Sequence, residues 1–312
     1  MPETRFGIKH FMINKNYLKK LVEKRSRFRA EKKYEEADKL RKKIEALGFQ
    51  VADKDEKSKL TDITAKKNAT AKKSYLVLFG SGEISSVGRS IHDYVLQQIG
   101  KKPVNIAIVS TPAGFQPNVS AVHEEIADFF NASLKNYHPD ISIIYANDAK
   151  KANDADLIRN IEKSDYIFVG PGSPTYAKRN LENSLLIGKI TEALAGGKSL
   201  CLSSAAVLAF SKFTLPVYEI YKAGAELYWE KGLDYFPPFM EWTTVIPHKN
   251  NNEGGKELDT SYCFMGKARF KKIRKLLPPA EKIIGIDEQT ALIIDAKNKS
   301  RKIMGKGSIE DL

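Results

Sequence analysis

Short apolar runs alternate with helical stretches from Ser74 onward, and this alternation limits the folds that the chain can adopt. Strands are predicted at Tyr75–Phe79, Val104–Val109, Ile141–Tyr145, Tyr166–Val169, Leu200–Leu202 and Thr243–Ile246, with more near Ile283, Leu292 and Ile303. Helices are predicted between them, near residues 86–99, 119–135, 153–162, 183–195 and 204–212. Continuous apolar strands that alternate with helices are typical of a parallel sheet covered on both faces. We therefore expect a three-layer α/β domain over residues 74–312.

The loops that follow these strands carry most of the residues suited to chemistry. Parallel sheets place their sites at the carboxyl ends of the strands, so these loops should meet at one edge. They read Gly80–Glu83, Ser110–Gly114, Gly170–Tyr176, Ser203-Ser204 and Pro247–Gly255. The functional site is expected at this edge.

The stretch KSLCLSSAAVLAF, residues 198–210, has the local plan of a nucleophile elbow. A short apolar strand meets a serine, small residues follow, and a helix begins, so that a sharp turn lifts one hydroxyl above the sheet. Leu202 and Ala206 stand where G-x-S-x-G has glycine. The alternative is a Ser-Ser N-cap at an ordinary strand-to-helix junction.

The glycine-rich loops GSGE and GPGS fit neither a Walker loop nor a complete G-x-G-x-x-G pattern, so tight turns are favoured over a nucleotide site and no cofactor is predicted. Of the five histidines, His248 alone follows a predicted strand in polar, glycine-rich surroundings. It is therefore the candidate base.

The front of the chain differs in charge. Residues 1–75 carry 22 Lys and Arg against 11 Asp and Glu, while the net charge of the whole chain is +13. A shift this sharp indicates a domain boundary and an interaction surface. We expect a basic helical hairpin over residues 1–50, ended by Gly48, and a flexible linker over residues 51–73.

Several classes of protein are disfavoured by composition. No apolar run approaches membrane-spanning length, and the first residues lack the apolar centre of a signal peptide. Cys201 and Cys263 are far apart and lack metal-ligand spacing. We expect a cytoplasmic protein without membrane contact, disulfide or metal site.

Residues 75–295 resemble the cyanophycinase and aspartyl-dipeptidase family of serine peptidases. The resemblance rests, in order, on the strand followed by GSGE, on IFVGPGSPTY, on LSSAAV and on GIDEQTALII at 285–294, the most specific of the four. It implies a class I glutamine-amidotransferase-like, flavodoxin-like fold and the cleavage of a small peptide or isopeptide bond.

The resemblance also implies site residues. Ser204 matches the nucleophile, and Glu219 and His248 suit the acid and the base. The oxyanion would be bound by the N–H of Ala205 with that of Gly172 or Ser173. Gly82 in the first loop and Arg269, which suits a substrate carboxylate, complete the predicted site.

Residues 21–53 resemble the end of the helical C-terminal domain of cysteinyl-tRNA synthetases, most specifically at ADKLRKKIEALG. This resemblance implies RNA contact by residues 1–73, and the alternative is an amphipathic hairpin with a solvated lysine face. Two readings of the whole chain follow: a serine hydrolase, expected to be a homodimer, or a catalytically silent amidotransferase-like scaffold whose hairpin binds tRNA.

Overall fold

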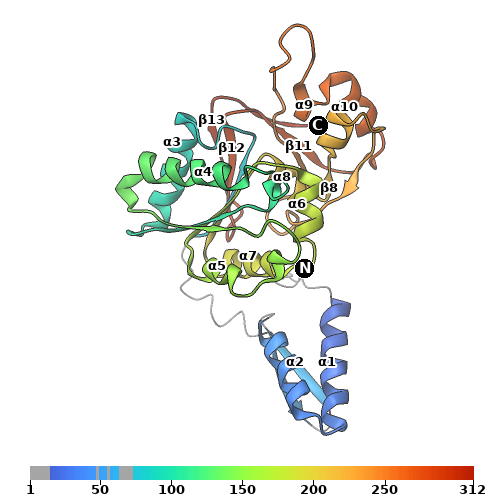
Figure 1. Ribbon diagram of the computed structural model, residues 1–312. Helices are drawn as coiled ribbons and strands as arrows, with labels where there is room; N and C mark the ends of the chain where they lie inside the picture. Colours follow the sequence, from blue (N-terminus) through green and yellow to red (C-terminus); the bar gives the residue numbers. More distant parts are fainter. Residues whose placement is uncertain (1–14, 47–48, 55–56, 63–72) are drawn as a thin grey trace, which may run out of the picture. The chain divides into compact units, whose positions relative to one another are not determined.

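The computed structural model describes residues 15–46, 49–54, 57–62 and 73–312 and divides the chain into two units, residues 1–71 and 72–312 (Figure 1). Gly48, the predicted end of the hairpin, and residues 63–72 of the predicted linker lie outside the described residues. Within the described ranges, no helix is long and apolar enough to span a membrane.

The first unit pairs two helices with a β-hairpin. Helices α1 (Lys15–Ala30) and α2 (Tyr34–Ala46) pack together, and β1 (Phe49–Lys54) pairs antiparallel with β2 (Lys57–Asp62). The prediction of a linker from residue 51 is therefore wrong over these strands. The reason is packing: Val51 is buried with Leu21 and Ile44 in a small core, which the polar composition of the stretch does not reveal.

The second unit contains a seven-stranded sheet with the order β13-β12-β3-β7-β6-β4-β5. The five parallel strands are β3 (Tyr75–Phe79), β4 (Asn105–Val109), β5 (Asp140–Ile144), β6 (Tyr166–Val169) and β7 (Ser199–Ser203). At one edge, β12 (Thr290–Asp295) and β13 (Arg301–Gly305) run antiparallel. The mostly parallel sheet confirms the predicted α/β fold class.

Helices cover this sheet on both faces (Figure 1). One face carries α3 (Ser86–Ile99) and α4 (Val119–Ser133), whose apolar residues join those of the strands in the largest buried cluster. The other face carries α5 (Asn160–Lys163) and α7 (Leu185–Ala195).

A second, three-stranded sheet lies beside the first. In it β10 (Thr244–Ile246) runs parallel to β11 (Ile283–Ile286), which pairs antiparallel with β14 (Ile309–Asp311). The predicted sixth strand thus belongs to a separate sheet. The two sheets meet where the His248 N–H donates to the Gly80 carbonyl at the end of β3, at 3.1 Å.

The second unit has further, mostly short elements outside these two sheets. They are α6 (Pro174–Leu181), α8 (Ala205–Phe210), β8 (Phe213–Thr214), a π-helical turn (Tyr218–Lys222), β9 (Glu230–Lys231), α9 (Ser261–Phe264) and α10 (Gly266–Arg274). Short 3₁₀ turns complete the unit.

Candidate active site

Ser204 occupies a sharp turn between β7 and α8. Its backbone has φ 52° and ψ −113°, a left-handed conformation that a residue with a side chain rarely adopts. Strain of this kind is found at functional turns, where it is maintained by the packing around it. The turn is flanked by Ser203, Ala205 and Ala206, all buried, as expected where a strand and a helix pass closely. The local geometry is that of an elbow, and the Ser204 side chain faces a cavity.

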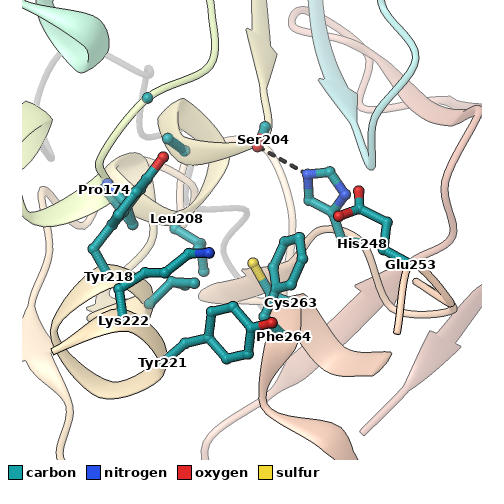
Figure 2. Close-up of a pocket in the computed structure, with 13 residues that line it drawn as sticks. Pro174, Ser204, Leu208, Tyr218, Tyr221, Lys222, His248, Glu253, Cys263 and Phe264 are labelled. Carbon is teal, nitrogen blue, oxygen red and sulfur yellow. Dashed lines mark hydrogen bonds between the residues drawn. The ribbon is translucent and has the colours of Figure 1, made fainter. Parts of the chain in front are cut away.

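Ser204 and His248 lie in hydrogen-bond contact, with Oγ and Nε2 2.9 Å apart (Figure 2). On the other side of the ring, Nδ1 lies 2.8 Å from Glu288 Oε1. A carboxylate only accepts, so the Nδ1–H donates to Glu288 and Nε2 is free to accept the Ser204 hydroxyl proton. The three side chains form a continuous relay.

Glu288 is fixed by the loop that follows His248. The Asn251 amide donates to Glu288 Oε1 at 2.9 Å, and the Asn250 side chain accepts from the Glu288 N–H at 2.8 Å. The hydrogen bond from His248, assisted by the one from Asn251, lowers the pKa of the Glu288 carboxyl below its ordinary value. Glu288 is therefore ionised at neutral pH and suited to orient the imidazole.

The prediction that Glu219 pairs with His248 is wrong. Glu219 Oε1 accepts a hydrogen bond from the Thr175 hydroxyl at 2.6 Å, and Nδ1 of His248 is engaged by Glu288 instead. Glu288 was not among the predicted site residues. The available signal was its position in GIDEQTALII, the most specific of the matched segments.

Two backbone N–H groups next to Ser204 have no acceptor among the described residues, those of Ala205 and Gly172. Both residues line the cavity, which suits them to bind an oxyanion. Gly172 has φ +147°, and a Cβ there would lie 2.0 Å from the Pro112 carbonyl oxygen, so this position requires glycine. The alternative donor, Ser173, does not fit, because its N–H donates to that same carbonyl at 2.8 Å.

The cavity beside Ser204 has a volume of about 190 Å³ and a largely apolar wall. It is lined by Gly172, Pro174, Ser204, Ala205, Leu208, Val217, Tyr218, Tyr221, Lys222, His248, Glu253, Cys263 and Phe264. The Lys222 side chain points into it near Leu208 (Figure 2), and no described carboxylate lies within ion-pair distance of its ammonium group. Cys263 also lines the cavity, but burial raises the pKa of its thiol to about 12, so the thiol is a poor nucleophile at neutral pH.

Gly82 and Arg269 lie outside the lining of this cavity. The Gly82 carbonyl accepts the Ser85 hydroxyl at 2.6 Å, so it organises the start of α3. Arg269 donates to the Met265 and Phe264 carbonyls, at 2.7 and 2.9 Å, and braces the turn that carries Phe264. The predicted contact of Arg269 with a substrate carboxylate is therefore not favoured, and Lys222 is the cation at the cavity.

Solved peptidase structures share this fold. The chain matches the crystal structure of a peptidase from an acI-B1 actinobacterium with a TM-score of 0.62 and 20% identity, over 78% of this chain and 92% of that one. It matches a protein from Listeria monocytogenes EGD-e, named for peptidase E, with a TM-score of 0.50 and 15% identity, over 75% of this chain and 100% of that one. No protein-family model and no curated protein matches the sequence.

Proposed function

We propose that this chain is a serine peptidase that cleaves a small peptide or isopeptide bond, with Ser204 as nucleophile, His248 as general base and Glu288 as the acid of the triad. The observation that carries the proposal is the hydrogen-bonded relay from Ser204 through His248 to Glu288 at the wall of a cavity. A serine hydroxyl is a weak nucleophile at neutral pH and requires such a base, itself held in one tautomer by a carboxylate.

The first half of the reaction forms an acyl-enzyme. Ser204 Oγ attacks the carbonyl carbon while its proton passes to His248 Nε2, and Glu288 stabilises the resulting imidazolium. The carbonyl oxygen becomes an oxyanion between the N–H groups of Ala205 and Gly172, where each donor contributes about 3 kcal/mol to the transition state. His248 then donates its proton to the leaving amine, and the C–N bond breaks.

The second half regenerates Ser204. Water gives a proton to His248 Nε2 and attacks the ester carbonyl, and the same two N–H groups bind the second oxyanion. When the tetrahedral intermediate collapses, the proton returns from His248 to Ser204 Oγ and the carboxylic acid product leaves.

The experiment is a comparison of the wild type with Ser204→Ala on a peptide library, with products read by mass spectrometry. Cleavage products that depend on Ser204 are expected. A library left intact by the wild type, or cut equally by both proteins, contradicts the proposal.

A second candidate function belongs to the first unit, as an RNA-binding module. Its small core leaves basic side chains of α1 and α2 exposed, among them Lys24, Arg27, Lys39 and Lys42. If these contact phosphates, affinity must fall steeply with salt, because each neutralised phosphate releases counterions. The full chain should bind tRNA more tightly at about 50 mM than at about 200 mM salt, and a chain that starts at Ser74 should not bind. Equal affinity of the two proteins contradicts RNA binding by this unit.

A further inference from the structure

Two exposed aromatic rings lie side by side next to the cavity. Phe115 is 46% exposed and Tyr218 is 40% exposed, and their ring centroids are 6.3 Å apart. Tyr218 lines the cavity, and behind Phe115 the ring of Tyr176 follows at 5.2 Å. Single exposed apolar residues are ordinary, whereas contacting rings that continue a pocket form a patch suited to binding.

This patch is built on a well-packed frame. Phe115 follows Gly114, where a Cβ would lie 2.0 Å from the Asn147 carbonyl oxygen, so the loop packs directly against that residue. The same carbonyl accepts the Tyr176 hydroxyl at 3.0 Å, and the Asn147 side chain accepts the Ser110 hydroxyl at 2.6 Å. The frame fixes the position of the Phe115 backbone and holds Tyr176 behind its ring, so the exposed ring face is preorganised.

The patch lies on the acyl side of the scissile bond. Figure 2 shows Tyr218 and Pro174 on one side of Ser204, and His248 with Glu253 on the other. His248 must reach the leaving nitrogen to protonate it, so the leaving group lies on the His248 side. The acyl part of a bound peptide therefore runs past Pro174 and Tyr218 toward Phe115.

The order of residues along the peptide assigns the position. Tyr218 lines the cavity beside Ser204, and the Phe115 ring follows it with centroids 6.3 Å apart, so the two rings continue the cavity on the acyl side. The residue whose carbonyl Ser204 attacks occupies the cavity, and the residue before it reaches the two rings.

We propose that Phe115 and Tyr218 form a subsite for an aromatic or large apolar side chain at the second residue on the acyl side of the scissile bond. This inference rests on the proposed peptidase function and adds that the enzyme selects peptides with at least two residues before the bond. An aromatic side chain of the substrate can pack against the two exposed rings, whereas a polar side chain gains little from that contact.

The test uses two peptide aldehydes, acetyl-Phe-Ala-aldehyde and acetyl-Gly-Ala-aldehyde, as competitors of a fluorophosphonate that labels Ser204. An aldehyde forms a reversible hemiacetal with the serine hydroxyl, so a bound aldehyde protects the serine. In the wild type the Phe compound should protect at about tenfold lower concentration than the Gly compound. In Phe115→Ser this ratio should fall toward one.

Ile303→Ser serves as the matched control. Ile303 is an exposed apolar residue, 53% exposed, on the edge strand β13, and it does not line the cavity. Its variant should keep the wild-type ratio. Equal protection by the two aldehydes, protection by neither, or a preference that survives in Phe115→Ser overturns the subsite. Failure of the fluorophosphonate itself to label Ser204 overturns the proposed function, and the two failures are thereby distinguished.

Discussion

His248 Nδ1 lies 2.8 Å from Glu288 Oε1, and the Asn251 amide donates to the same oxygen. His248 follows β10 of the small sheet, and Glu288 follows its neighbour β11. Both loops meet at Gly80, where a Cβ would lie 2.1 Å from the Asp287 carbonyl oxygen. The small sheet thus positions His248 and Glu288, the proposed base and acid, together, while the large sheet positions Ser204.

Replacement of Glu288 by Gln should lower kcat/KM by roughly 10³-fold or more, because the amide no longer fixes the tautomer of His248 or stabilises its cation. Steady-state kinetics on any peptide that the wild type cleaves provide the measurement. The comparison is Glu253→Gln. Glu253 lines the cavity without a hydrogen bond to His248 in the described structure, so the kcat/KM of this variant should fall by about tenfold or less. Equal losses in the two variants would contradict the assignment of the acid.

The proposed nucleophile and base could be predicted because their signals are local. Ser204 sits in a recognisable strand–serine–helix pattern, and His248 is one of few histidines and follows a strand. Glu288, the proposed acid, has no comparable signal. The order Ser, acid, His favoured Glu219. That residue lies on a π-helical turn, and its side chain accepts a hydrogen bond from Thr175 of α6 instead. Only the pairing of β10 with β11 brings Glu288 to His248, and such pairing cannot be read from composition.

In the fold, too, the elements with local sequence signals could be predicted, and those that depend on tertiary packing could not. Helix α3 spans Ser86–Ile99, the range predicted from periodicity, and the five parallel strands lie close to their predicted positions. Helix α6 begins within the predicted loop Gly170–Tyr176, and Pro174 is at its first turn, where the missing N–H of proline is harmless. The hairpin of β1 and β2 was missed because its stability depends on packing with the helices before it.

Replacement of Thr175 by Val should lower the free energy of unfolding by about 1–3 kcal/mol, because it leaves the half-buried Glu219 carboxylate without its donor. Thr175 donates to Glu219 Oε1 at 2.6 Å and contacts the Ser173 hydroxyl at 3.0 Å, while Glu219 Oε2 is already buried without a partner among the described residues. Urea unfolding provides the measurement. Glu219→Gln keeps an acceptor for Thr175 and removes the charge, so the free energy of unfolding should fall by less in this variant. A Thr175→Val protein as stable as the wild type would refute this link between the turn and α6.

The free energy of unfolding should fall at acid pH because of His92. The ring is buried among four phenylalanine side chains and Tyr166, and burial lowers its pKa to about 4. The unfolded state, with a pKa of about 6.5, takes up a proton as the pH falls below that value, whereas the folded state does not until about pH 4. Between pH 7 and pH 5 the wild type should therefore lose about 2 kcal/mol more than His92→Gln, measured by urea unfolding. Identical pH dependence of the two proteins would show that His92 is not responsible.

Lys222 should favour substrates that place a carboxylate in the cavity. Its ammonium group lies 4.9 Å from the Tyr221 ring centroid and points into the space beside Ser204 (Figure 2). Paired peptides with Asp or Asn before the scissile bond should differ in KM by about tenfold in favour of Asp, and Lys222→Met should remove the difference. Lys256→Met, which changes an exposed lysine outside the cavity lining, should retain it. An Asp preference that persists in Lys222→Met would assign the selectivity elsewhere.

Covalent labelling by a fluorophosphonate, with the modified residue identified by tryptic mass spectrometry, tests directly whether Ser204 is the nucleophile. Ser203 is the control, since its hydroxyl is buried with no partner among the described residues and faces no base. We expect a label on Ser204 in the wild type and in Ser203→Ala, and none in Ser204→Ala. A label that persists in Ser204→Ala, or a wild-type protein that takes none, would contradict this assignment of the nucleophile.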